Sequence, residues 1–157
     1  MGIYERWLLL RLLDLAMRNK EATRYRRETI PAATGRVLER SAEEIPLESR
    51  SIDTVVTTFT RCTVPDAAKA LREARRVLKP GGTLLFAEHG HAPDPAVLGW
   101  QRRLDPLWTR IAGGCHLDRR IDHLIRDAGF QIVDLEQEYA KGPRPFAYVY
   151  RGCARPA

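Results

Sequence analysis

The stretch RVLKPGGTLLFAEH, residues 76–89, decides the fold class of this chain. Its first residues close an amphipathic helix, because Pro80 cannot continue a helix and the two glycines that follow supply a tight turn. Residues 83–88 then form a continuous, mainly apolar run, which is typical of a strand covered on both faces. Helix, turn and buried strand in direct succession indicate an α/β protein.

The residues before this stretch extend the same alternation. The β-branched run Ile52-Asp-Thr-Val-Val-Thr-Thr-Phe59 predicts a buried strand at 53–59. Asp66 can cap a helix whose apolar face, opposite its basic face, runs from Ala67 to Leu78. Together with the strand at 83–89, this gives a strand-helix-strand unit, in which the two strands should be parallel.

The residues after the stretch predict two helices and a hairpin. One helix opens at Asp94-Pro95, is kinked or divided by Pro106 and ends at Gly113-Gly114. A second runs from Asp118 to Ala128. Strands at 131–139 and 145–153 flank the turn Lys141-Gly-Pro-Arg144, which is short enough to make them antiparallel.

Length and composition favour one globular domain. The 157 residues are 44% hydrophobic and 29% charged, with a net charge of +6. The basic residues are spread along the chain and match none of the common nucleic-acid motifs, so we expect no nucleic-acid partner. Three cysteines without a CxxC pair argue against a disulfide framework or a structural zinc site and favour a reducing cytoplasm.

The first 34 residues form a separate segment in this interpretation, and residues 35–157 form the α/β domain. Leucines near the start repeat at helical spacing, while Arg11 and Asp14 interrupt the apolar run well short of the roughly 20 residues that a membrane span needs. The segment is therefore an amphipathic helix. It either packs on its own domain or makes peripheral contact with a membrane surface.

Four segments in a fixed order carry a family resemblance: Ser41-Ala-Glu-Glu-Ile-Pro46, residues 51–59, Arg76-Val-Leu-Lys-Pro-Gly-Gly82 and Leu84-Leu-Phe-Ala-Glu-His89. Together they resemble class I S-adenosylmethionine-dependent methyltransferases, notably those of ubiquinone and menaquinone biosynthesis and those acting on small thiols or lipids. The resemblance implies a Rossmann-like, doubly wound, mainly parallel sheet with a C-terminal antiparallel hairpin. It also implies S-adenosylmethionine as cofactor and direct methyl displacement to a small-molecule or lipid-like acceptor.

One part of the family pattern is missing from this sequence. The strand predicted at 36–39 should run into a glycine-rich turn that approaches the cofactor closely. Glu39 matches the acid that begins this motif, but Arg40 and Ser41 follow it. Residues 40–52 are too few for even one βαβ unit of about 30 residues. The chain therefore resembles a truncated member, and a non-catalytic scaffold that has lost cofactor binding is the alternative function.

The resemblance also implies the site residues. It assigns cofactor binding to Glu39, Ser41, Ala42, Glu43, Thr57, Thr58 and Phe59. The alternative is that the serine turn only caps a helix and that the threonines only end a strand. His89, at the end of its strand, would face the substrate as a general base, since imidazole titrates near neutral pH. It could equally be a solvated loop histidine.

We expect no metal site from the spacing alone. His89 and His91 form an H-x-H pair, but the spacing suggests no third ligand. Cys115, followed by His116, is interpreted as a buried cysteine beside a substrate loop rather than a nucleophile.

A reduced sheet also predicts association. The missing strands would leave residues 36–39 as a sheet edge, and exposed edges invite pairing with another chain. We therefore expect a homo-oligomer, most simply a dimer. The family resemblance implies the strand order 36–39, 53–59, 83–89, 145–153 and 131–139 across the sheet.

Overall fold

The structure is a computed structural model, and it describes residues 41–60 and 62–157. The predicted helical segment 1–34, the strand at 36–39 with its edge, and Glu39 lie outside these residues. The described elements follow in the order β1 (Ile52–Thr58), α3 (Ala67–Val77), β2 (Leu78–His89), α4 (Pro95–Ile111), α5 (Ile121–Asp127), β3 (Phe130–Tyr139), α6 (Arg144–Ala147) and β4 (Tyr148–Pro156).

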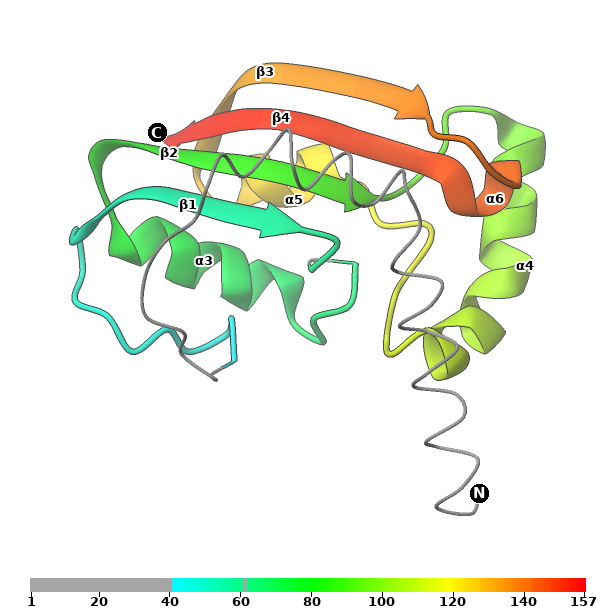
Figure 1. The fold of residues 1–157 in the computed structure, drawn as a ribbon, viewed down its shortest axis with the longest axis horizontal. Coiled ribbons are helices and arrows are strands. Elements are labelled where there is room, and N and C mark those ends of the chain that lie inside the picture. The colour runs from blue at the N-terminus through cyan, green and yellow to red at the C-terminus, as the bar shows by residue number, and fades with distance from the viewer. Residues whose placement is uncertain (1–40, 61) are drawn as a thin grey trace, which may run out of the picture.

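A mixed sheet organises the domain, with the described strands in the order β1-β2-β4-β3. β1 and β2 are parallel, and β4 runs antiparallel to both β2 and β3. This arrangement confirms the α/β fold class, the closing antiparallel hairpin and the predicted order of these four strands. In Figure 1, α3 and α5 lie on the same side of the sheet, and α4 and α6 lie beyond the carboxyl ends of β1 and β2.

The predicted turn at Lys79–Gly82 lies inside β2, which begins at Leu78 directly after α3 ends. Ile52 pairs with Leu78, but Thr54 already pairs with Thr83, so β2 makes an irregular excursion between these two pairs. Gly81 has a φ of 79° there, a left-handed conformation that glycine adopts without a Cβ penalty. The glycines thus serve the excursion, and pairing with β1 resumes at Thr83.

The last strand starts later than the sequence predicts. Pro143 is the N-cap of a short helix, α6, and Pro145 lies in its first turn, where proline is tolerated. β4 therefore begins at Tyr148 rather than at residue 145. Helix α4 continues through Pro106 to Ile111, so the proline does not divide it. The other boundaries agree with the predicted ones within a few residues.

The core lies between the sheet and the two helices that cover it. Leu71 of α3, Leu84 and Phe86 of β2, and Ile121 and Ile125 of α5 are all fully buried. Burial of side chains of this size stabilises a fold by about 1.5–3 kcal/mol each. The apolar face predicted for the helix before the LKPGG stretch is therefore confirmed as core.

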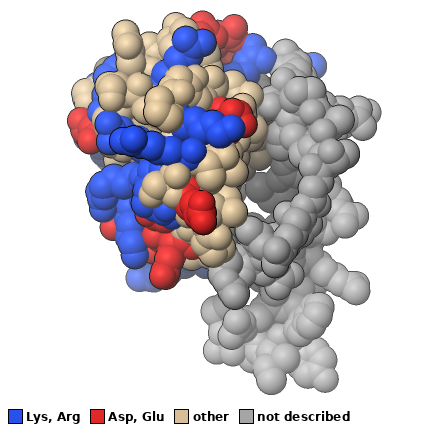
Figure 2. Space-filling model, turned by 90° about the vertical axis from the view of Figure 1, so that its left-hand side faces the viewer, with Lys and Arg blue, Asp and Glu red and all other residues tan. Residues whose placement is uncertain are grey.

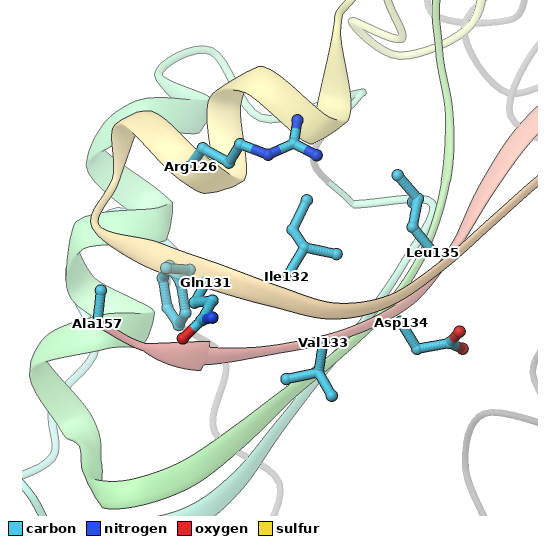
Figure 3. A pocket seen from close by; sticks show the side chains of 8 residues that line it. Arg126, Gln131, Ile132, Val133, Asp134, Leu135 and Ala157 are labelled. Carbon is cyan, nitrogen blue, oxygen red and sulfur yellow. The ribbon is translucent and has the colours of Figure 1, made fainter.

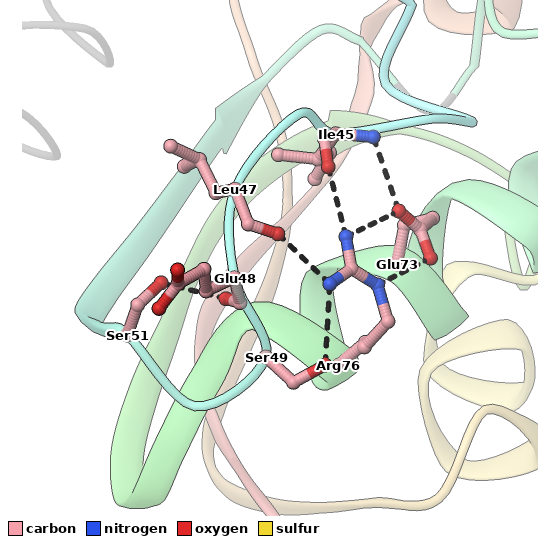
Figure 4. Close-up of polar contacts among 7 residues, drawn as sticks. All are labelled: Ile45, Leu47, Glu48, Ser49, Ser51, Glu73 and Arg76. Carbon is pink, nitrogen blue, oxygen red and sulfur yellow. Dashed lines mark hydrogen bonds and ion pairs between the residues drawn. The ribbon is translucent and has the colours of Figure 1, made fainter.

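The segment that leads into β1 is attached to α3 through one arginine (Figure 4). Arg76 donates to both carboxylate oxygens of Glu73, at 2.8 Å each, and to the carbonyl oxygens of Ile45 at 2.8 Å and Leu47 at 2.9 Å. Glu73 in turn accepts from the backbone N–H of Ile45 at 3.1 Å. Because this segment has no secondary structure of its own, these bonds fix its path to the strand.

Charges of both signs share the face drawn in Figure 2, where Lys and Arg predominate and Asp and Glu lie among them. Lys79 and Asp53 form an ion pair at 2.8 Å between exposed side chains. None of the described helices combines the length and the apolar character needed to cross a membrane.

Candidate functional site

The carboxyl ends of β1 and β2 lie side by side, which is where open α/β sheets place their ligands. Beyond β1, the Phe59 N–H still donates to the Ala87 oxygen of β2 at 2.8 Å, although Phe59 has a φ of 48°. A left-handed conformation is rare for a bulky residue and is a strained feature typical of functional sites. The Phe59 ring is buried and lies 4.6 Å from the His89 ring, centroid to centroid. The strand ends therefore hold the imidazole against an aromatic face.

Two loops meet beside His89. The first contains Cys62 and follows β1; the second contains Cys115 and follows α4. The His116 N–H donates to the Cys62 oxygen at 2.7 Å and joins them. Gly114 has a φ of 92°, and a Cβ there would lie 2.9 Å from the Thr63 oxygen, so only glycine fits between the loops without displacement.

Cys62, His89 and Cys115 form one cluster, in which a ligand atom from each side chain lies within 4.8 Å of the other two. Both cysteines are buried, and the histidine is half-buried. The H-x-H spacing suggested no third ligand, whereas the fold brings two distant cysteines to His89. His91 is not part of this cluster. A second group, Asp105, His116 and Asp118, has similar spacing but lies nearer the surface.

The two thiols share a hydrogen bond, and it moves their pKa values apart. The pKa of Cys62 is raised, first by its bond with Cys115 and then by burial. The pKa of Cys115 is lowered, first by the same bond and also by the Trp108 indole, against the opposing effects of burial and of Glu88. One thiolate accepting from one thiol accounts for both directions, since a hydrogen bond to the charged form favours ionisation. The fully buried Glu88 adds a further carboxyl group nearby.

An aspartate of α4 holds the loop that carries Cys115. Asp105 accepts from the Leu117 N–H at 2.6 Å and contacts the His116 Nδ1 at 3.0 Å. Since charge-assisted bonds are stronger than neutral ones, this carboxylate fixes the backbone on the far side of Cys115. Cys115 is only 8% exposed, which agrees with its interpretation as a buried cysteine.

A buried amide holds the segment that follows His89. Gln101 is 1% exposed; its Nε2 donates to the oxygens of Gly90 at 3.0 Å and Pro145 at 3.1 Å, and its Oε1 accepts from the Ala92 N–H at 3.0 Å. Every polar atom of the side chain is used, as burial requires. Gln101 therefore fixes the backbone on the far side of His89.

The residues predicted for cofactor binding are only partly near this cluster. Thr58 ends β1 and Phe59 follows it on the way to Cys62, and the buried Thr57 hydroxyl has no hydrogen-bond partner within the described residues. Ser41 accepts from the Glu43 N–H at 3.1 Å, and Glu43 accepts from the Asp66 N–H at 2.9 Å. The side chains of Ser41 and Glu43 are therefore engaged with backbone N–H groups, the second of them at the N-cap residue of α3. Within this turn, Ala42 is the residue left to contact a ligand. Their role with the cofactor stays a prediction.

An open hollow lies elsewhere, along the outer strand β3, and Figure 3 shows the side chains that line it. It is formed by Arg126, Phe130, Gln131, Ile132, Val133, Asp134, Leu135 and Ala157. None of these residues belongs to the cluster at the strand ends. We therefore assign the hollow no part in the site.

Comparison with known proteins identifies the family. The methyltransferase domain family Methyltransf_11 matches residues 8–86, so the chain belongs to the class I S-adenosylmethionine-dependent methyltransferases. The match confirms the resemblance drawn from the four segments, together with S-adenosylmethionine as the cofactor of this family. A SAM-dependent methyltransferase from Methanosarcina mazei has the same fold, with a TM-score of 0.59 at 20% identity over 74% of this chain and 65% of that one.

Two curated relatives are closer in sequence. Thiol S-methyltransferase TMT1B of Rattus norvegicus is 43% identical over 104 residues, which cover 66% of this chain and 41% of the relative. Ubiquinone/menaquinone biosynthesis C-methyltransferase UbiE of Bartonella henselae is also 43% identical, over 107 residues covering 68% of this chain and 38% of the relative. The chain spans about two fifths of the length of these relatives.

Sequence reasoning identified His89 but missed its two neighbours. Cys62 lies 27 positions before His89 and Cys115 lies 26 after it, outside any compact ligand motif. A signal was nevertheless present. Cys62 follows the strand predicted at 53–59, and the carboxyl ends of parallel strands meet at one edge of a sheet, so this signal concerns Cys62 alone.

Proposed function

We propose that this chain carries the part of an S-adenosylmethionine-dependent methyltransferase that binds the methyl acceptor, and that the acceptor is a small thiol. The observation that carries the proposal is the position of His89, held against Phe59 at the carboxyl edge of the sheet. The thiol acceptor is favoured by the 43% identity to a thiol S-methyltransferase. The similar identity to a quinone-pathway C-methyltransferase makes a carbon acceptor the competing outcome.

The cofactor supplies a sulfonium-bound methyl group that is ready for displacement. For its part, the chain must hold the acceptor in line and remove a proton, since a thiolate is the nucleophilic form of a thiol. His89 is placed to take that proton, and Phe59 restricts the orientation of its ring. Cys62 and Cys115 lie buried beside the His89 ring.

The residues present fit only part of a cofactor site. Thr57 to Phe59 lie at the strand end where the methionine moiety would bind, and Ala42 lies in the turn expected beside adenine. The glycine-rich turn and the ribose acid have no counterpart in the sequence. A charge-assisted hydrogen bond contributes roughly 1.5–3 kcal/mol, so losing the acid alone should weaken binding about 10- to 100-fold. We expect weak cofactor binding by one unassisted chain, which calorimetric titration would measure.

The direct test of function follows transfer of a labelled methyl group to a simple aromatic thiol, with the matching phenol and a naphthoquinol as alternative acceptors. We expect labelled thioether from the thiol and none from the phenol. His89→Gln should lower the rate about 10²- to 10⁴-fold, the usual contribution of a general base. His91→Gln is the matched control and should leave the rate unchanged. Transfer to the quinol alone would overturn the thiol assignment, and transfer to no acceptor at saturating cofactor would favour the scaffold.

A further inference from the structure

We propose that Cys62, His89 and Cys115 form a binding site for Zn²⁺, and that the fourth coordination position takes the thiol acceptor. The second half of this inference rests on the proposed function, whereas the first half rests on the cluster alone. Two sulfur atoms and one imidazole nitrogen form a donor set that suits Zn²⁺ and selects against Mg²⁺ and Ca²⁺.

The geometry requires little movement. In a tetrahedral zinc site, neighbouring ligand atoms lie about 3.5–3.8 Å apart, as follows from Zn–S and Zn–N bonds of about 2.3 and 2.0 Å. The ligand atoms of the three side chains already lie within 4.8 Å of one another. Closure by at most about 1.3 Å is therefore enough, and side-chain rotation can provide it.

The contacts around the cluster hold its three ligands in place, as expected of a preformed metal site. Each ligand comes from a different part of the fold: the loop after β1, the end of β2 and the loop after α4. The His116–Cys62 backbone bond joins the two loops, Asp105 holds the Cys115 loop, and Phe59 packs on the His89 ring. Groups that orient the ligands in this way raise metal affinity, because the site needs little reorganisation on binding.

Charge favours the same occupant. Two thiolates balance the charge of one Zn²⁺, so the buried cysteines bind the ion without leaving a net charge inside the protein. Three protein ligands leave one tetrahedral position open, which is the arrangement of catalytic rather than structural zinc sites. His89 is half-buried, so this position can be reached from solvent.

The open position defines the chemistry. A thiol R–SH binds the cation as R–S⁻ and releases its proton to solvent, because a coordinated thiol is deprotonated. The thiolate sulfur then forms a bond to the methyl carbon as the bond from that carbon to the cofactor sulfur breaks. The bonding pair stays on the cofactor sulfur, and the products are the methyl thioether and S-adenosylhomocysteine. In the metal-loaded protein, the cation rather than His89 promotes loss of the proton from the acceptor thiol.

The test of the metal site uses the full chain without cofactor. Titration with Co²⁺, which reports its ligands spectroscopically, should give one ion per chain, thiolate-to-cobalt charge-transfer absorption and a tetrahedral visible spectrum. Zn²⁺ should displace the Co²⁺. Cys62→Ser, Cys115→Ser and His89→Gln should each weaken binding more than about 100-fold, since loss of an outer-shell group alone costs 10- to 100-fold.

Three controls keep this test specific. Cys153→Ser removes the remaining cysteine, which is half-buried on β4, and should leave binding unchanged. Asp118→Asn disables the second cluster and should also leave it unchanged. Circular dichroism of each variant checks the fold, and the half-buried His89→Gln provides a test even if a buried cysteine variant misfolds. Absence of cobalt–thiolate absorption, or loss of binding in Asp118→Asn but not in Cys62→Ser, would overturn the metal site.

The acceptor half is tested separately. Adding the aromatic thiol to the Co²⁺ form should increase the charge-transfer absorption and shift the visible bands, whereas the phenol should not. If the thiol binds to cobalt but no methyl group is transferred, the inference stands and the proposed function fails. If methyl transfer occurs at full rate after chelation and in Cys62→Ser, the proposed function stands and the inference is wrong.

Discussion

At the amino end of β1, polar side chains bond to the backbone, whereas at its carboxyl end they gather around one another. Arg76 and Glu73 fix the segment from Ile45 to Ser49 through hydrogen bonds to two of its carbonyls, one of its N–H groups and the Ser49 hydroxyl (Figure 4). Cys62, His89 and Cys115 instead bring their ligand atoms to one point. Polar groups that satisfy a backbone have a structural reason to be there, whereas converging nucleophilic and metal-binding groups imply a ligand. The difference separates a structural end of the sheet from the end at which we propose the functional site.

The largest effect on stability is expected at Gln101, which supports the functional end. Gln101→Leu leaves the Ala92 N–H and the carbonyls of Gly90 and Pro145 buried without their partner, and each such group costs about 1–3 kcal/mol. We expect a loss of roughly 2–4 kcal/mol in the free energy of unfolding, measured by urea denaturation. Gln131→Leu, at an exposed site on β3, is the control and should change stability by less than about 0.5 kcal/mol. Equal effects would show that Gln101 has no special supporting role.

The next effect concerns the glycine between the two loops. Gly114→Ala combines a left-handed backbone with a Cβ 2.9 Å from the Thr63 oxygen, and we expect a loss of roughly 1–3 kcal/mol. Gly113→Ala has the left-handed backbone, with a φ of 62°, but meets nothing within 4 Å, so it should cost only about 1 kcal/mol. Cobalt binding sharpens the comparison, because only Gly114→Ala should separate Cys115 from Cys62. Equal loss of cobalt affinity in both variants would mean that loop spacing does not control the cluster.

A smaller, pH-dependent effect on stability is expected for the Arg76–Glu73 pair, near the amino end of β1. Arg76 is the main cause that lowers the pKa of Glu73 to about 2, from an ordinary value of 4.5. Because the folded-state pKa is lowered, the stabilisation is fully present above pH 4.5 and is lost as the pH falls towards 2. Glu73→Gln should therefore cost on the order of 1 kcal/mol at neutral pH, a modest value because solvent screens the pair. Urea denaturation of both proteins at several pH values should show the difference shrinking below pH 4.5; a constant difference would exclude the charged pair as its cause.

The smallest effect on stability is expected for an ion pair near the amino end of β1 that makes no hydrogen bond to the backbone segment before it. Lys79 and Asp53 are 44% and 80% exposed, so their contact should contribute between about 0 and 1 kcal/mol. Asp53→Asn should change the midpoint of thermal unfolding only slightly, and high salt should remove the change. A larger loss than that of Glu73→Gln would contradict the view that backbone anchoring, rather than charge, stabilises this end.

The sequence by itself determined the elements and their order. Local chemistry defined them: the Asp66 cap, the LKPGG stop, the apolar run after it and the final hairpin. Each depends on neighbouring residues, so the α/β class and the position of His89 at a strand end could be predicted, whereas the order of the strands across the sheet came from the family resemblance. The same local reasoning placed the turn at Lys79–Gly82 outside the sheet, because pairing with β1 cannot be read from one segment.

Only the tertiary structure decided the contents of the site. Cys62 and Cys115 are separated by a helix, a strand and a second helix, and no spacing rule connects them. They meet because β1 and β2 are parallel and end at one edge, and because Gly114 lets the loop after α4 approach the Thr63 backbone. Contacts of this kind arise from packing of the whole chain, which is why a lone histidine in the sequence becomes one member of a three-residue cluster in the fold.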